Sequence, residues 1–166
     1  MVLDFKERFP NIELSTAERS RTRLSRMLRN GTLDILIVTP NAMLNDCKSL
    51  PLWSERILLM LSKDHPLVGH DTVHWTDLSS ETVLISQYDP GPEIEDLLNS
   101  KLISSIDRPK IERHDVSRGA LKALVSMKLG ISLVLESDLG ATLPSPLYRE
   151  LRDGSGPSSD SCLTRV

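Results

Sequence analysis

Aromatic residues and a surplus of basic charge are both lacking in this chain. Phe, Trp and Tyr make up 4% of its 166 residues, which argues against a surface that stacks nucleic-acid bases. The 20 Lys and Arg residues are outnumbered by 23 Asp and Glu, so the net charge is −3. A domain that grips DNA by itself usually carries a strong basic excess. We therefore expect no specific DNA binding by this chain alone.

Cysteines and long apolar runs are also scarce. Cys47 and Cys162 follow no metal or redox spacing, and we expect two free thiols in a reducing compartment. No apolar run approaches the roughly 20 residues that a membrane helix needs. The charged N-terminal segment MVLDFKERFP does not fit a secretory signal. These absences predict a cytoplasmic protein.

Catalytic and cofactor signatures are missing as well. The sequence contains no Gly-x-Ser-x-Gly elbow, no P-loop and no Gly-x-Gly-x-x-Gly motif. His70 and His74 have a His-x-x-x-His spacing, but no third ligand with clear spacing follows them. We predict no enzyme activity, no cofactor and no bound metal.

What the sequence does contain is an alternation of helix and strand patterns. Hydrophobic residues make up 39% and charged residues 26%, a composition typical of globular proteins. Alternating strands and helices predict an α/β protein with a mostly parallel sheet covered by helices. The expected strands are residues 12–17, 33–38, 55–61, 81–85, 109–114, 131–135 and 147–151. The expected helices are residues 3–8, 19–30, 75–78, 93–102 and the helix that begins after Ser117.

The segment SRGALKALVSMKLGISLVLESD, residues 117–138, carries the clearest pattern. Ser117 is the expected N-cap of a helix, and Gly130 is its expected stop in a positive-φ conformation. A short apolar strand follows, which suggests burial on both faces. The apolar face of the helix is expected to contain Ala120, Leu121, Leu124, Val125 and Leu129.

This segment resembles the effector-binding domain of LysR-type transcriptional regulators. Residues 28–38, LRNGTLDILIV, and residues 51–67, PLWSERILLMLSKDHPL, resemble two further segments of that family in the same order. The resemblance implies a two-lobed periplasmic-binding-protein-like (type 2) fold over residues 1–152. His65-Pro66-Leu67 is a hallmark of the family for which we expect a structural role.

The resemblance also implies domain boundaries. Lobe I would hold about residues 1–54 and lobe II about 63–145, with crossover strands at 55–61 and 147–151. The family's helix-turn-helix domain, first effector-domain strand and final helix have no counterpart in the sequence, so we expect an incomplete lobe I. Residues 153–166, rich in Gly, Ser and Pro at the start, are expected to be a disordered tail.

Ligands of open α/β sheets bind where strands end, close to helix N-termini. Thr39 and Ser86 follow expected buried strands and match polar contacts of the family, although each could equally be a simple turn residue. Ser117 is more often only an N-cap. The expected effector-binding residues are Thr16, Thr39, Asn41, Ser86, Gln87, Asp115 and Ser117.

Five arginines crowd residues 19–29. They could form a patch for phosphate or an acidic partner. Because the whole chain is acidic, we favour a solvated helix face.

The function implied by the resemblance is effector sensing. A small molecule, such as an organic acid or an aromatic metabolite, would bind between the lobes and change their arrangement. DNA would be a partner only through a helix-turn-helix domain outside this chain, and the complete protein would be a homo-oligomer without membrane contact. Three alternatives stay open: a solute-binding protein, a cytosolic enzyme of the same fold, and a non-functional truncated remnant.

Overall fold

A computed structural model describes residues 2–39, 47–102, 108–140, 146–152 and 162–165. The strands are β1 (Trp53–Leu61), β2 (Val73–His74), β3 (Thr82–Ser86), β4 (Lys110–His114), β5 (Ser132–Leu135), β6 (Leu147–Arg152) and β7 (Cys162–Arg165). The helices are α1 (Val2–Arg8), α2 (Arg21–Arg29), α3 (Gly91–Lys101) and α4 (Arg118–Ser126), with short 3₁₀ segments at Pro66–Gly69, Trp75–Leu78 and Glu136–Gly140.

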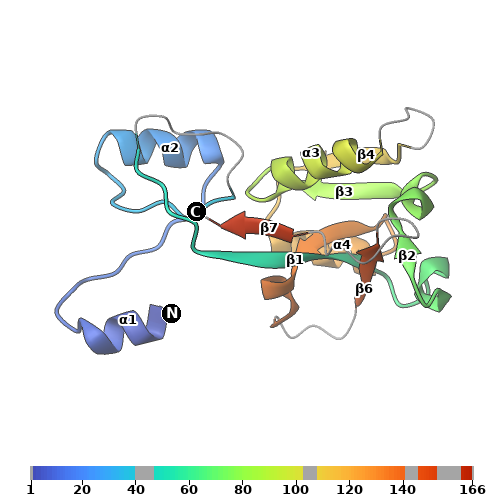
Figure 1. The fold of residues 1–166 in the computed structure, drawn as a ribbon, viewed down its shortest axis with the longest axis horizontal. Coiled ribbons are helices and arrows are strands. Elements are labelled where there is room, and N and C mark those ends of the chain that lie inside the picture. The colour runs from blue at the N-terminus through green and yellow to red at the C-terminus, as the bar shows by residue number, and fades with distance from the viewer. Residues whose placement is uncertain (1, 40–46, 103–107, 141–145, 153–161, 166) are drawn as a thin grey trace.

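The strand β1 is the centre of the main sheet (Figure 1). Its second half lies between β5 and β6, both antiparallel to it, and its first half pairs with β7, also antiparallel. The short β2 extends the sheet parallel to β6. Because β1 and β6 run side by side over residues 58–61 and 147–150, the two expected crossover strands are adjacent antiparallel neighbours. The expectation of a mostly parallel sheet is therefore wrong for the main sheet, in which β1 is antiparallel to β5, β6 and β7.

The strands β3 and β4 form a parallel pair that Ile131 joins to the main sheet. The Leu84 amide donates to the Ile131 carbonyl over 2.8 Å, and the Ile131 amide donates to the Thr82 carbonyl over 2.9 Å. Through these two bonds β3 lies beside Ile131, the residue that immediately precedes β5. The carboxyl ends of β3 and β4 therefore lie together at one edge of the α/β unit.

Alternate residues of the strands face two separate apolar layers. Leu59 of β1 and Leu133 of β5 pack with Ile94 of α3, whereas Met60 of β1 packs with Val125 of α4 on the other face. Successive side chains of a strand point to opposite faces, so burial on both faces requires a continuous apolar run, as in β1 and β5. Burying one such side chain stabilises the fold by roughly 1.5–3 kcal/mol, so the two helices are held firmly against the sheet.

The expected strands at 55–61, 81–85, 109–114, 131–135 and 147–151 are confirmed within a residue or two. The expected strands at 12–17 and 33–38 are wrong. No residue of the described segment 2–39 lies in a strand, and Ile35 is 74% exposed. An apolar run becomes a strand only when a neighbouring strand pairs with it. The pairings of the described residues supply no such neighbour, and Figure 1 shows α1 and α2 apart from the strands.

The end of α4 also differs from its prediction. Ser117 caps the helix as expected, because its Oγ accepts from the Ala120 amide over 3.3 Å. The residue with positive φ, however, is Lys128 at 63°, and Gly130 has no positive φ. Ala120 and Leu129 lie exposed rather than on the buried face. Since the helix ends at Ser126, Leu129 is outside it and no longer follows the helical period.

The expected disordered tail of residues 153–166 is wrong for residues 162–165, whereas residues 153–161 and 166 lie outside the described residues. Cys162–Arg165 is the strand β7, which pairs with β1 from Trp53 to Arg56. A Gly/Ser/Pro-rich stretch precedes this strand in the sequence. The pairing depends on where β1 lies in the folded protein, so the local sequence does not predict the strand. The four residues themselves alternate too briefly to show a strand period.

Candidate functional site

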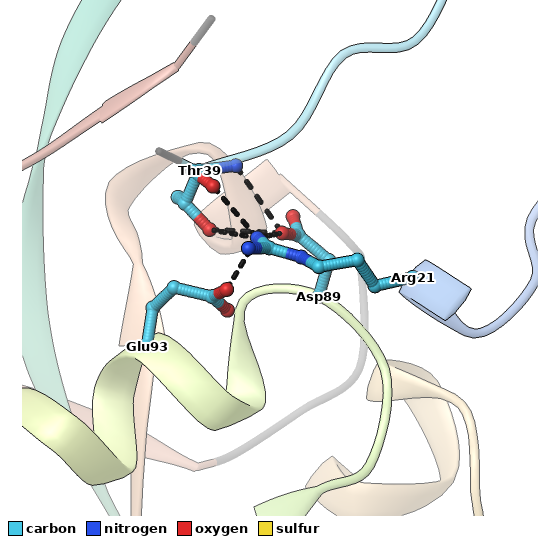
Figure 2. A network of polar contacts seen from close by, with 4 residues as sticks. All are labelled: Arg21, Thr39, Asp89 and Glu93. Carbon is cyan, nitrogen blue, oxygen red and sulfur yellow. Dashed lines mark hydrogen bonds and ion pairs between the residues drawn. The ribbon is translucent and has the colours of Figure 1, made fainter. Parts of the chain in front are cut away.

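Four polar residues from distant parts of the chain meet beyond the carboxyl end of β3. They are Arg21 at the start of α2, Thr39, Asp89 in the loop after β3, and Glu93 in the first turn of α3 (Figure 2). Two belong to the segment expected in lobe I and two to the segment expected in lobe II. The cluster therefore joins the two parts of the chain.

Thr39 and Asp89 share two hydrogen bonds. The Thr39 hydroxyl donates to Asp89 Oδ1 over 2.8 Å, and the Thr39 amide donates to the same oxygen over 3.2 Å. Thr39 is fully buried, although no strand precedes it. A buried hydroxyl without a partner would be costly, and the two hydrogen bonds to the carboxylate compensate for the burial of Thr39.

The guanidinium of Arg21 completes the cluster. Its Nη2 lies 2.8 Å from Asp89 Oδ1, 2.6 Å from the Thr39 carbonyl oxygen and 3.2 Å from Thr39 Oγ1. The same nitrogen forms an ion pair with Glu93 Oε1. One nitrogen thus contacts four oxygens from three residues, all of them acceptors toward it.

Glu93 is the most deeply buried ionisable group of the cluster, with 4% of its side chain exposed. Burial raises the pKa of its carboxyl above the ordinary value. A hydrogen bond from its own backbone amide, the charge of Arg21 and a hydrogen bond from Thr39 oppose this shift only in part. Its second oxygen, Oε2, and Arg21 Nε are both buried without a hydrogen-bond partner. Arginine and glutamate therefore meet through one atom each rather than as a two-bond fork.

A second polar group lies where β3 and β4 end. The Ser86 hydroxyl donates to the Val116 carbonyl over 2.9 Å and accepts from the Tyr88 amide over 3.1 Å. The Gln87 amide donates to the His114 carbonyl over 2.9 Å. These bonds hold the loop after β3 against the start of α4, so residues 86–89 and 114–117 form one rigid rim.

Tyr88 extends this rim toward the N-terminal segment. A hydrogen bond to Asp115, and then the charge of that carboxylate, raise the pKa of the Tyr88 phenol above its ordinary value. Glu18 and Arg19 lie close enough to Tyr88 to act on the same pKa in opposite directions. The segment that follows Thr16 is therefore near the rim.

A small cavity of about 20 Å³ lies behind the rim, with room for about one water molecule. It is bounded by Ser86 of β3, Gly91 at the start of α3, Arg118 of α4 and Asp138. Arg118 donates to Asp138 Oδ1 over 3.0 Å, which closes one wall. This volume is too small for an organic effector, so the polar cluster rather than this cavity marks the candidate site.

The structure brings several of the expected effector-binding residues together. Thr39 lies in the four-residue cluster and Ser86 in the rim, with Gln87, Asp115 and Ser117 nearby in the same two loops. The side chains of Gln87, Asp115 and Thr16 are exposed, and Ser117 caps α4. Asn41 lies outside the described residues.

Three residues of the cluster were missing from the sequence-based list. Asp89 and Glu93 are four residues apart across the start of α3, a spacing that puts both carboxylates on one side. Arg21 was included only in the arginine-rich helix, for which a solvated face was favoured. That prediction is wrong for Arg21, which pairs with acidic groups of the same chain, while Arg23 and Arg26 are exposed as expected.

Within residues 2–39, 47–102, 108–140, 146–152 and 162–165, no group of three or more His, Cys, Asp or Glu side chains could hold a metal ion. None of the helices in the same ranges has the length and apolar character needed to cross a bilayer.

Comparison with protein families gives a match along nearly the whole chain. Residues 1–162 match the LysR substrate binding domain. The chain is 26% identical over 141 residues to the transcriptional dual regulator GltC of Bacillus subtilis (strain 168), which covers 84% of this chain and 46% of GltC. The chain thus spans about half the length of this curated relative.

Solved structures show the same fold. The reduced form of the OxyR regulatory domain from Pseudomonas aeruginosa matches with a TM-score of 0.77 and 19% identity, covering 99% of this chain and 78% of that chain. The BenM effector binding domain with its effector benzoate matches with a TM-score of 0.75 and 21% identity, covering 99% and 73%. The predicted two-lobed periplasmic-binding-protein-like fold is confirmed.

Proposed function

The chain belongs to the family of LysR substrate-binding domains, and we propose that it senses a small-molecule effector between its two lobes. The effector would bind beside Thr39 and the rim formed by residues 86–89 and 114–117. This proposal involves binding without a chemical reaction, in keeping with the relatives, which are transcriptional regulators.

The observation that carries the proposal is the cluster around Thr39. It joins a residue of the N-terminal segment to Asp89 and Glu93 beyond β3, so a ligand that enters there must change contacts between the lobes. A ligand shifts a conformational equilibrium only by its difference in affinity for the two states. Coupling of this kind is typically about 1–3 kcal/mol, which is comparable to the loss of one or two bonds to a charged group.

The wider role follows from the family. The effector-induced change would pass to a DNA-binding domain outside this chain and so control transcription, and the protein would act in the cytoplasm. The complete protein would act as a homo-oligomer. GltC is named a transcriptional dual regulator, and this similarity supports the regulatory role.

The test is a search for a compound that stabilises the chain. We would screen organic acids, amino acids, amines and aromatic metabolites by thermal melting, because a ligand that binds the folded state raises its stability. Titration calorimetry would then measure the dissociation constant of each hit for the parent chain, Thr39→Val and the control Thr76→Val. Thr76 is exposed in the 3₁₀ segment Trp75–Leu78.

We expect Thr39→Val to weaken binding about tenfold or more, since a hydrogen bond to a charged group contributes roughly 1.5–3 kcal/mol. Thr76→Val should bind as the parent does. Equal affinity of both variants for every hit would contradict the site, and a screen without any stabilising compound would contradict effector sensing by this chain.

A further inference from the structure

The oxygen atoms around Arg21 Nη2 form a cradle for a cation. Three contacts are hydrogen bonds that Arg21 Nη2 donates to the Thr39 carbonyl, the Thr39 hydroxyl and Asp89, and the fourth is the ion pair with Glu93. The Thr39 hydroxyl hydrogen already points to Asp89. The Thr39 amide is likewise engaged with Asp89, and the backbone amide of Glu93 acts on its own carboxyl. The donors of the cluster other than Arg21 are therefore already used, and an incoming group meets the buried Oε2 lone pairs of Glu93.

Glu93 shows that this cradle is incompletely filled. Its Oε2 atom is buried and has no hydrogen-bond partner, although the side chain is only 4% exposed. A buried carboxylate oxygen without a donor is costly. A planar group with two parallel N–H bonds would satisfy both oxygens of Glu93, whereas Arg21 reaches only one of them.

Arg21 is held weakly by its own helix. It is the first residue of α2, where the helix dipole disfavours a cation, and Leu24 is the only buried residue of that helix. Its side chain is 22% exposed, compared with 4% for Glu93. The guanidinium can therefore leave the cradle by a movement of a lightly packed element.

We infer that Thr39, Asp89 and Glu93 form a recognition site for a guanidinium or amidinium group, and that Arg21 occupies this site as an internal substitute for the ligand. An effector that carries such a group displaces Arg21, forms the two-bond fork with Glu93 and releases the N-terminal segment from α3. This assignment of effector chemistry rests on the proposed function, because it uses the same site between the lobes.

The experiment uses methylguanidinium chloride as the probe and the 166-residue chain as the protein. Titration calorimetry would compare the parent, Arg21→Ala, the control Arg23→Ala and the double variant Arg21→Ala with Glu93→Gln. Arg23 is exposed on the same helix. Ionic strength would be held low and equal with sodium chloride, because salt screens such contacts.

We expect Arg21→Ala to bind the probe at least tenfold more tightly than the parent or Arg23→Ala, and to recover melting temperature as the probe is added. The Glu93→Gln change should abolish this gain. If Arg21→Ala does not fold, Arg21→Gln takes its place with the same expectation. Equal binding by the Arg21 and Arg23 variants, or a gain that survives Glu93→Gln, would overturn the inference.

The proposed function fails separately. A carboxylate compound whose binding to the parent depends on Thr39 would uphold effector sensing and overturn the cation site. Conversely, methylguanidinium binding to Arg21→Ala that requires Glu93, combined with a screen that finds no ligand for the parent, would uphold the cation site and contradict effector sensing.

Discussion

Replacing Gly130 by alanine is expected to destabilise the domain strongly, although Gly130 does not have a positive φ. An added Cβ would lie 2.5 Å from the Thr82 carbonyl oxygen and 3.0 Å from Cγ and Cδ2 of Leu84. The first of these contacts is with backbone that cannot rotate away. Either β3 or residues 130–131 must move, and the two bonds that link Ile131 to Thr82 and Leu84 lie directly at that point.

The magnitude follows from these contacts. Overpacking a tight interior costs about 1–3 kcal/mol, and each of the two backbone hydrogen bonds contributes about 1 kcal/mol. We expect the free energy of unfolding to fall by about 3–5 kcal/mol, which corresponds to a drop of roughly 6–20 °C in melting temperature for a domain of this size. Circular dichroism during urea and thermal unfolding measures both quantities.

The chain offers a matched control in Gly69→Ala. An added Cβ at Gly69 meets nothing within 4 Å, so its effect should stay within about 0.5 kcal/mol. Equal unfolding curves for the two variants would show that β3 and residue 130 do not approach as closely as the structure has them.

Three further changes and one binding assay test the site. Gly91→Ala should impair folding more than Gly130→Ala, because its Cβ would lie 1.7 Å from the Ser86 carbonyl oxygen; soluble yield and melting temperature check this. Thr39→Val should lower the free energy of unfolding by about 1–3 kcal/mol in urea titrations, since Asp89 loses a buried donor. Burial raises the pKa of Glu93 above its ordinary value of 4.5, so between the unfolded and folded pKa values the folded state keeps a proton that the unfolded chain has lost. The free energy of unfolding therefore falls as pH rises through the interval between these two pKa values. Glu93→Gln should remove this part of the pH dependence in unfolding measurements. A mobility-shift assay at near-physiological salt should show no sequence-specific DNA retention by the 166-residue chain, whose net charge is −3.

The α/β part of the fold could be predicted because its signals are local. The N-cap at Ser117 and the apolar run that contains β5 are visible in the sequence without any knowledge of the fold, and the structure has both. The same local rules failed for residues 12–17 and 33–38. Residues 12–17 have the strand period and residues 33–38 are a nearly continuous apolar run, but neither signal supplies a neighbouring strand, and Ile35 and Ile37 lie exposed.

The candidate site could be predicted only in part, for a related reason. The sequence indicates Thr39 because this residue follows an apolar run. That run is not a strand, and what holds the buried Thr39 in place is its hydrogen bonding to Asp89. The partners Arg21 and Asp89 are 68 residues apart in the sequence. No periodicity joins residues at that distance, so the acidic pair and its arginine become visible only when the chain is folded.

What brings the acidic pair to Thr39 is the close approach of α3 to β3. Gly91 begins the helix so near the end of β3 that a side chain on this residue would collide with the Ser86 carbonyl oxygen, and only glycine allows this approach. Ile94 and Leu98 then fix the helix on the apolar layer, and this fixes the direction in which Glu93 points. A glycine required by backbone contact and two core residues thus determine where a buried carboxylate lies. The carboxylates of the cluster are therefore positioned by a helix that packs on the apolar core, whereas the cation comes from the lightly packed helix α2. A ligand that competes for the carboxylates would move α2 rather than α3.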